Sequence, residues 1–274
     1  MVWQTSKFNI FINPKNISIH DRGFNYGDGL FETILIKDSK IKYLIDHTKR
    51  LHAGCKKLKL NKPSLDLLKK NIKKSIGKKT NCVIKIILTR GSSTFGYKFT
   101  KDISHNLYFI KHDKTLAVTK NRAIKLKISN YNIYENSDLA KIKHLKRIDQ
   151  CLIANELNMQ KNIDDLVVTY NNNIIETLSS NIFFAKINKS NIIFYSPKIA
   201  KCGIDGIIKN QIIKYLKNKK YKVLEKDISI KTLKNYDISF KVNSVQGLVF
   251  IDQIENNKFS KDHIIYNILK DFIY

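Results

Sequence analysis

The hydrophobic positions in the first part of the chain follow two different repeats. Runs rich in Ile, Val, Leu and Phe, bounded by Asn, Asp, Ser, Gly and Pro, are typical of strands and turns. Apolar residues three or four positions apart predict amphipathic helices instead. The expected strands are residues 8–12, 31–36, 41–44, 82–88 and 107–110, and the expected helices are residues 46–60 and 63–76.

Both patterns continue beyond a polar stretch at residues 113–120, which we interpret as a linker. The expected strands there are residues 123–128, several short ones within 165–195, 221–228 and 238–242, and the expected helices are 148–159, 207–216, a short one near Leu233 and one from Asp262. Strands mixed with helices on both sides of the linker predict an α/β (α+β) fold of two domains, residues 1–112 and 121–274, with a cleft between them.

Composition excludes several classes of protein. Hydrophobic residues at 43% and charged residues at 27% are ordinary values for a globular chain. No apolar run approaches the roughly 18 to 20 residues of a membrane-spanning helix, and the N-terminus lacks the order of a secretory signal. The four cysteines are scattered, with no pairing typical of a metal site. These features predict a cytoplasmic protein with reduced thiols, no membrane association and no metal.

The chain is strongly basic, with a formal net charge of +27, and this raises the alternative of a non-enzymatic nucleic-acid-binding protein. However, only five of the fifty basic residues are arginines, and the lysines are spread over the whole chain. That distribution argues against a nucleic-acid partner. Where lysine is the usual cation, an arginine indicates a site that needs its planar, two-pronged guanidinium. Four arginines lie near glycine bends, strand ends or helices: Arg22, Arg50, Arg90 and Arg147.

Several residues could carry chemistry, although each also fits an ordinary structural role. Residues 203–206, Gly-Ile-Asp-Gly, precede an expected helix, and amides at a helix start bind anions. Glu176 precedes a run of small polar residues, and Ser244 follows a strand. Composition cannot single out Lys143 in so lysine-rich a chain. The neighbouring His144 is either a catalytic base or, more commonly for a histidine, a structural residue.

Five ordered segments resemble the class IV family of pyridoxal-phosphate-dependent enzymes. They are residues 25–33, 47–51, 143–150, 176–183 and 203–206. Each is weak alone, but together they occur in the order and at the spacing of that family. The resemblance extends from about residue 8 to about residue 250. It implies a two-domain class IV aminotransferase-like fold, pyridoxal 5'-phosphate in the interdomain cleft, a small-molecule substrate and a homodimer.

The resemblance also implies a role for each candidate residue. Lys143 would hold the cofactor as a Schiff base and then act as acid and base, while Glu176 would pair with the ring nitrogen. The implied phosphate ligands are Arg50, the amides of Ile204 and Asp205, and Ser244. The implied pocket residues are Thr33, as a second catalytic group, with Phe31 and Tyr97 as walls.

Within the family, two segments resemble the 4-amino-4-deoxychorismate lyases most. These are residues 143–150, Lys-His-Leu-Lys-Arg-Ile-Asp-Gln, and residues 89–97, Thr-Arg-Gly-Ser-Ser-Thr-Phe-Gly-Tyr. The implied reaction eliminates pyruvate from aminodeoxychorismate and leaves 4-aminobenzoate for folate biosynthesis. D-amino-acid and branched-chain aminotransferases, the alternative within the family, carry different residues after the lysine. Phe95 and Lys146 depart from the lyase pattern, so the sequence leaves open how the substrate's carboxylates are held.

Overall fold

The chain, described as a computed structural model, divides into two compact units. Residues 1, 6, 114–123, 189–190, 261 and 274 lie outside the described residues. Unit 1 comprises Met1–Leu116 and Ile142–Arg147, and unit 2 comprises Ala117–Lys141 and Ile148–Tyr274. The expected linker, residues 113–120, lies outside the described residues except for Asp113.

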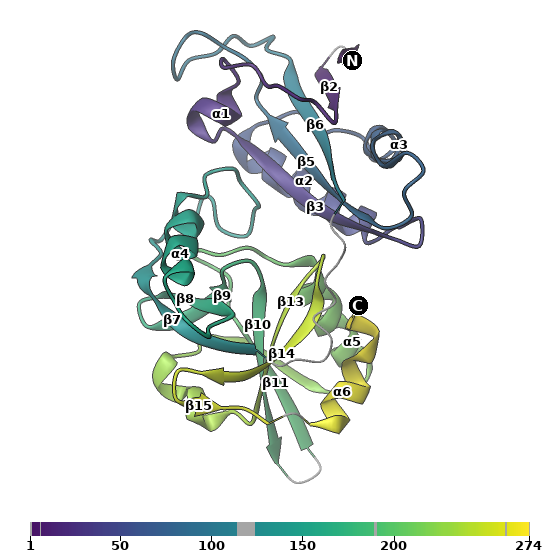
Figure 1. Cartoon of the computed structure of the whole chain (residues 1–274). Coiled ribbons are helices and arrows are strands. Elements are labelled where there is room, and N and C mark those ends of the chain that lie inside the picture. The colour runs from purple at the N-terminus through teal and green to yellow at the C-terminus, as the bar shows by residue number, and fades with distance from the viewer. Residues whose placement is uncertain (1, 6, 114–123, 189–190, 261, 274) are drawn as a thin grey trace. The chain divides into compact units, whose positions relative to one another are not determined.

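Unit 1 is built on a six-stranded sheet, counted over its described residues, in the order β1-β2-β6-β5-β3-β4 (Figure 1). Strands β2 and β6 are parallel, and the other neighbours are antiparallel. The strands are β1 (Val2–Thr5), β2 (Phe8–Ile12), β3 (Gly29–Lys37), β4 (Lys40–Ile41), β5 (Cys82–Thr89) and β6 (His105–His112). The expected strands and the β3–β4 hairpin are confirmed, with β4 shorter than expected because Leu44 already begins a helix.

Two long helices pack on this sheet, α2 on β3 and α3 on β6. The helices of the described part of unit 1 are α1 (Arg22–Tyr26), α2 (Leu44–Leu58) and α3 (Leu65–Ile76). Ser64 caps α3 by accepting the Leu67 N–H at 3.1 Å. Gly54 lets α2 approach the sheet closely, since a Cβ there would lie 2.7 Å from Leu30 Cδ2. The buried face of α2 therefore reaches the side chains of β3.

Unit 2 contains a nine-stranded sheet in its described residues, in the order β12-β11-β10-β13-β14-β7-β8-β9, with β15 paired to β14. The strands are β7 (Ile124–Asn132), β8 (Asp165–Tyr170), β9 (Asn173–Thr177), β10 (Asn181–Asn188), β11 (Asn191–Pro197), β12 (Lys222–Lys226), β13 (Ile238–Asn243), β14 (Gly247–Ile254) and β15 (Asn257–Lys258). The pairs β11–β12, β14–β7 and β7–β8 are parallel. Strands β14 and β15 were not expected from the sequence, whereas the others were.

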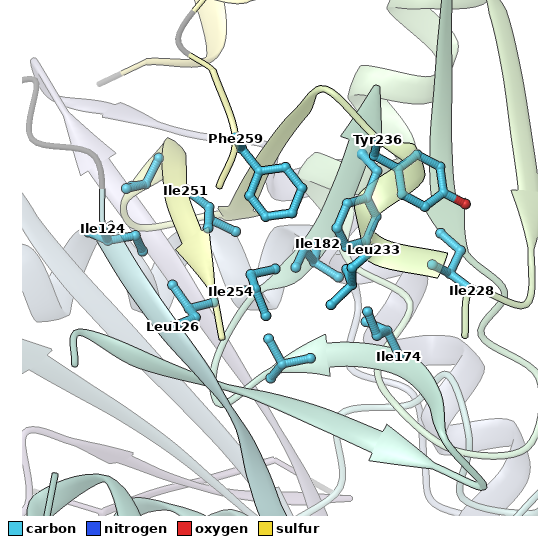
Figure 2. Packing of buried hydrophobic residues seen from close by; sticks show 13 residues of the cluster. Ile124, Leu126, Ile174, Ile182, Ile228, Leu233, Tyr236, Ile251, Ile254 and Phe259 are labelled. Atoms are coloured by element: carbon cyan, nitrogen blue, oxygen red, sulfur yellow. The ribbon is translucent and has the colours of Figure 1, made fainter. Parts of the chain in front are cut away.

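The helices and the core complete unit 2. The helices are α4 (Ile148–Asn158), α5 (Ile207–Asn218), η1 (Ile230–Asn235), α6 (His263–Leu269) and η2 (Lys270–Phe272). Isoleucines from several strands and aromatic rings from near η1 and β15 form one buried cluster (Figure 2). Within it, the ring centroid of Phe184 lies 5.0 Å from that of Tyr236 and 6.1 Å from that of Phe259. This cluster stabilises the sheet that carries the candidate residues of unit 2.

The domain boundaries differ from the sequence-based expectation in one segment. Residues 142–147 were expected in the second domain, but they group with unit 1. The reason is backbone pairing with the start of β3: Leu145 N–H donates to Gly29 O at 3.0 Å, and Leu30 and His144 form an antiparallel bridge. The chain therefore enters unit 2, returns to unit 1 for six residues and enters unit 2 again.

Among the described residues, no helix combines the length and the apolar character that a membrane span requires.

Candidate active site

In unit 1, Lys143 lies beside Phe31. The Phe31 N–H donates to Lys143 O at 2.8 Å, which fixes the lysine's backbone against β3. The Lys143 Nζ then lies 4.4 Å from the centroid of the Phe31 ring, within the range of a cation–π contact. Two residues that sequence analysis assigned to the site are therefore neighbours.

Two further cations approach the same ring. Lys85 Nζ lies 5.3 Å from the Phe31 centroid, and Arg147 Cζ lies 6.0 Å from it. Arg147 is oriented by its own loop, since its Nε donates to His144 O at 2.9 Å. A ring surrounded by three cations gives this face of β3 a positive potential, which attracts anionic groups.

Thr33 lies on the same face of β3 as Phe31. Successive strand residues point to opposite faces, so Phe31 and Thr33 share one face and Glu32 lies on the other. The burial pattern agrees, because Glu32 is buried whereas Phe31 and Thr33 are half-buried. Thr33 also pairs directly with Lys85 of β5. A hydroxyl group therefore lies on the face that carries the Lys143–Phe31 contact.

The opposite face of β3 carries a buried ionic cluster that sequence analysis did not predict. Arg50 forms a bidentate ion pair with the Glu32 carboxylate: Nε donates to Oε1 at 2.8 Å, and Nη2 donates to Oε2 at 2.6 Å. His47 Nδ1 lies 2.6 Å from the same Oε2. His47 and Arg50 are three residues apart on α2, so one helix face delivers both to Glu32. Glu32 and His47 do lie inside the segments 25–33 and 47–51, and the spacing of His47 from Arg50 was the available signal.

The charges in this cluster are set by burial and by the ion pair. Burial alone would raise the pKa of Glu32, but the charge and hydrogen bonds of Arg50, with the hydrogen bond of His47, lower that pKa to about 2. Burial lowers the pKa of His47, against the opposing effect of Glu32. His47 is therefore neutral at pH 7, with its proton on Nδ1 facing the carboxylate. Its Nε2 is buried and has no hydrogen-bond partner among the described residues.

His144 has the properties of a structural residue. Burial, with the neighbouring charges of Arg147 and Lys146, lowers the pKa of His144 to about 3. A group with so low a pKa is a weak base at neutral pH. Its backbone also forms the bridge to Leu30. These observations favour the structural interpretation of His144 over the catalytic one.

In unit 2, Glu176 and Ile204 form the centre of the second set of candidate residues. Glu176 is buried on β9, and its Oε2 accepts the Ile204 N–H at 3.0 Å. The other end of the same residue is also held, since Asn181 Nδ2 donates to Ile204 O at 2.9 Å. Gly206 is required here, because a Cβ at that position would lie 1.7 Å from Asn181 Oδ1. The loop 203–206 is thus locked against β9 and β10.

The amides expected to bind phosphate are already engaged in this structure. The Ile204 N–H donates to Glu176, and the Asp205 N–H donates to Lys141 O at 3.3 Å. Both amides thus face acceptors of unit 2 itself, and their role as phosphate donors stays a prediction. A phosphate at this loop has to replace those acceptors.

Ser244 follows β13 in a turn shaped by Asn243. The Asn243 Oδ1 accepts the N–H groups of Val245 and Gln246 at 2.9 and 2.7 Å. Its Nδ2 donates to Ser180 Oγ at 2.9 Å, which links this turn to the segment that follows Glu176. The turns after Glu176 and after β13 are far apart in the sequence, and the pairing of β10 with β13 brings them together.

Tyr97, which the sequence analysis predicts as a pocket wall, lies at the surface of unit 1 in the loop after β5. Its side chain is 84% exposed, and its ring packs 5.2 Å from that of Tyr26. Arg22 holds this loop by donating to Gly96 O at 2.6 Å, to Tyr97 O at 2.9 Å and to Lys98 O at 3.1 Å. In the described ranges, no three His, Cys, Asp or Glu side chains are grouped as a metal site.

Comparison with known proteins is consistent with this geometry. Residues 29–254 match the family model described as amino-transferase class IV. The chain is similar to an aminodeoxychorismate lyase of Vibrio harveyi, with 26% identity over 87% of this chain and 88% of the relative. Its fold resembles the crystal structure of 4-amino-4-deoxychorismate lyase from Pseudomonas aeruginosa, with a TM-score of 0.84, 22% identity and 94% coverage of both chains. It also resembles the branched-chain amino acid aminotransferase of Escherichia coli, with a TM-score of 0.82, 18% identity and coverage of 94% and 88%.

Proposed function

Because the chain belongs to the amino-transferase class IV family, we propose that it is a pyridoxal-phosphate-dependent aminodeoxychorismate lyase. The proposed reaction eliminates pyruvate from 4-amino-4-deoxychorismate and yields 4-aminobenzoate. The observation that carries the lyase assignment is the hydroxyl of Thr33 on the β3 face where Phe31 contacts Lys143. The similarity to the Vibrio harveyi lyase supports the same choice.

The residues present fit pyridoxal phosphate. The cofactor needs an amine, an acidic partner for its ring nitrogen and donors for its phosphate. Lys143 offers the amine, and the buried carboxylate of Glu176 offers the acid. Gly206 leaves the loop 203–206 without a side chain at its closest approach to Asn181. Arg50 and Ser244 complete the proposed phosphate ligands, together with the Ile204 and Asp205 amides once these leave their present acceptors.

Each residue then has a defined task. Bound pyridoxal phosphate supplies an electron sink for negative charge at the substrate carbon next to the amine. Lys143 would hold the cofactor through Nζ and, once released, would take the proton from that carbon. Glu176 would favour a protonated ring nitrogen by its opposite charge. Only Ile142 separates Lys143 from Lys141, whose carbonyl pairs with Asp205, so the chain itself links the lysine to the loop 203–206.

Thr33 and the cations around Phe31 are assigned to the substrate. A hydroxyl donates and accepts hydrogen bonds, so Thr33 can donate to the departing enolpyruvyl oxygen, which an aliphatic side chain cannot do. The substrate carries two carboxylates, and Lys85 and Arg147 place positive charge on the same face. These two cations offer an answer to the open question raised by Phe95, whose side chain is 66% exposed.

The test supplies the purified protein with aminodeoxychorismate and, separately, with D-alanine or leucine plus 2-oxoglutarate. We expect pyruvate and 4-aminobenzoate in equal amounts from the first mixture, and little amino-group transfer in the others. Rapid transamination without 4-aminobenzoate would overturn the lyase assignment and leave a class IV aminotransferase. Absence of both activities in protein that binds the cofactor would overturn both.

We also propose a homodimer acting in the cytoplasm. The support is that α1 and the loop after β5 carry exposed aromatic side chains, a residue type that is enriched at protein interfaces. Phe24 is 64% exposed, Phe95 66% and Tyr97 84%. Sedimentation of the wild type and of Phe95→Ser tests this, with a dimer expected for the first and a weaker dimer for the second. Tyr97 stays a proposed wall of the substrate pocket.

A further inference from the structure

The buried carboxylate of Glu32 has no task in the reaction outlined above, yet three hydrogen bonds converge on it. Both oxygens accept from Arg50, and Oε2 also faces His47 Nδ1. Its side chain is 2% exposed, that of His47 is 1% exposed and that of Arg50 is 12% exposed. A carboxylate is costly to bury, so its retention beside a proposed phosphate ligand calls for a function.

We propose that Glu32, supported by His47, is a positioning residue that holds the Arg50 guanidinium ready for the phosphate of the cofactor. The proposal rests on the proposed function, because it takes Arg50 as a phosphate ligand. The two-pronged contact fixes both the position and the plane of the guanidinium. An arginine side chain otherwise loses much rotamer freedom when it binds, and here that loss occurs on folding.

His47 acts one step further from the phosphate. Its ring is neutral at pH 7, so Nδ1–H donates to Glu32 Oε2 without adding a second cation to the cluster. Oε2 thereby accepts from both His47 and Arg50, and the carboxylate cannot rotate without losing both contacts. His47 and Arg50 lie one turn apart on α2, and Gly54 keeps that helix close to β3.

Glu32 also has an opposing effect, because its negative charge partly neutralises Arg50 and so weakens attraction for phosphate. The two effects predict opposite results for Glu32→Gln. If orientation dominates, the variant binds pyridoxal phosphate more weakly. If neutralisation dominates, the variant binds it more tightly. The two-pronged geometry favours orientation, since a glutamine oxygen can accept only one of the two prongs without presenting its NH₂ group to Arg50.

The experiment compares the dissociation constants of the apoprotein for pyridoxal phosphate and for pyridoxal, which lacks the phosphate. Visible absorbance titration of each compound gives the ratio of the two constants. For Glu32→Gln we expect binding of pyridoxal phosphate to weaken about tenfold, the effect of one charged hydrogen bond, with pyridoxal binding nearly unchanged. A purely structural role would weaken both equally. Tighter binding of pyridoxal phosphate, an unchanged ratio or an equal loss for both compounds would overturn the proposal.

A matched control and a second variant complete the test. Asp28 receives a similar two-pronged contact from Arg90, at 2.8 and 3.1 Å, within the same unit. Asp28→Asn should lower the melting temperature but leave the ratio of the constants at the wild-type value. If Glu32→Gln does not fold, His47→Leu replaces it in the test. We expect this variant to bind pyridoxal phosphate about threefold more weakly relative to pyridoxal. His47→Asn keeps a short hydrogen-bond donor and should recover much of that binding.

Failure of this inference is distinguishable from failure of the proposed function. If wild-type protein binds pyridoxal phosphate no more tightly than pyridoxal, the phosphate role of Arg50 fails and the inference fails with it. If wild-type protein prefers the phosphorylated compound and Glu32→Gln keeps the same preference, only the inference fails.

Discussion

The Nζ of Lys143 lies 4.4 Å from the centre of the Phe31 ring, although the two residues are far apart in the sequence. The contact follows from a backbone hydrogen bond of 2.8 Å between Phe31 N–H and Lys143 O. One lysine among many is thereby fixed at a strand of unit 1 next to a hydroxyl and two further cations. Composition does not distinguish Lys143 from the other lysines, whereas its pairing with β3 does.

Replacing that lysine tests the proposed attachment of the cofactor. Lys143→Ala should abolish the visible absorption band of the bound cofactor and its labelling by borohydride, because no other amine is proposed to hold it. Circular dichroism should show an intact fold. Lys141→Ala, an exposed lysine two residues earlier, should keep both signals. Borohydride labelling of a different lysine in Lys143→Ala protein would show that the assignment is wrong.

Glu176→Gln should retain the cofactor but lose most turnover. A glutamine oxygen can still accept the Ile204 N–H, now 3.0 Å from Oε2, so the loop 203–206 stays in place. The neutral amide cannot keep the ring nitrogen protonated, and the loss of one charged hydrogen bond implies at least about a tenfold fall in kcat.

The control for this variant is Glu135→Gln, which removes an exposed ion pair with Lys201 in the same unit and should leave kcat unchanged. Full turnover by Glu176→Gln protein with cofactor bound would refute the role of Glu176.

Thr33→Val tests the hydroxyl on which the lyase assignment depends. The substitution keeps the β-branched shape that suits a strand but removes the donor, so pyruvate release should slow about tenfold or more. Thr33→Ser keeps the hydroxyl and should retain most of the rate. Stopped-flow detection of pyruvate measures both. Equal rates for the valine and serine variants would assign Thr33 a structural role only.

Glu32 makes stability depend on acid pH. The ion pair with Arg50 holds the pKa of Glu32 at about 2 in the folded chain, below its ordinary value of 4.5. A depressed carboxyl pKa contributes stability that is present above the ordinary value and is lost as the pH falls towards the folded value. Glu32→Gln should therefore cost on the order of 3 kcal/mol of unfolding free energy at pH 7 and much less near pH 2. Denaturant titrations at both pH values measure the difference in unfolding free energy between wild type and Glu32→Gln. An equal difference at the two pH values would contradict this prediction.

Gly206→Ala should destabilise unit 2 by about 1 to 3 kcal/mol, the usual cost of overpacking. The new Cβ would lie 1.7 Å from Asn181 Oδ1, so one of the two groups must move. Adding Asn181→Ala should recover part of the loss by removing the clash. Thermal denaturation of the single and double variants measures this, and equal melting temperatures for wild type and Gly206→Ala would contradict the packing.

The hydrophobic repeats predicted most elements because amphipathic helices and alternating strands carry their own signal. The helices from Leu65 and from Ile207 and the strand from Cys82 follow from local spacing and caps alone. Strand β14 (Gly247–Ile254) was missed even though it pairs with both β13 and β7. The segment 142–147 was placed in the second domain because its backbone bonds to β3 and its side-chain contacts with Phe31, which group it with unit 1, join residues far apart in the sequence.

The arginines show where sequence reasoning ends. The rarity of arginine correctly singled out Arg22, Arg50 and Arg90 as residues that need a planar guanidinium, and each makes several hydrogen bonds. The sequence does not identify the acceptors that they bind, because carboxylates, carbonyls and phosphates can all accept hydrogen bonds from a guanidinium in similar geometry. Tertiary structure decided that Arg50 grips Glu32, since α2 packs on β3 at Gly54.

The sequence by itself determined the family and the class of fold, and it predicted a set of candidate site residues. Those properties depend on residue types and their spacing, which are written along the chain. Tertiary structure alone decided which of these residues meet. It set Lys143 on Phe31, turned the Ile204 amide to Glu176 and buried Glu32 between His47 and Arg50. The physical reason is that strand pairing and helix packing set the distances between residues far apart in the chain. Local residue types and spacing do not encode these long-range contacts.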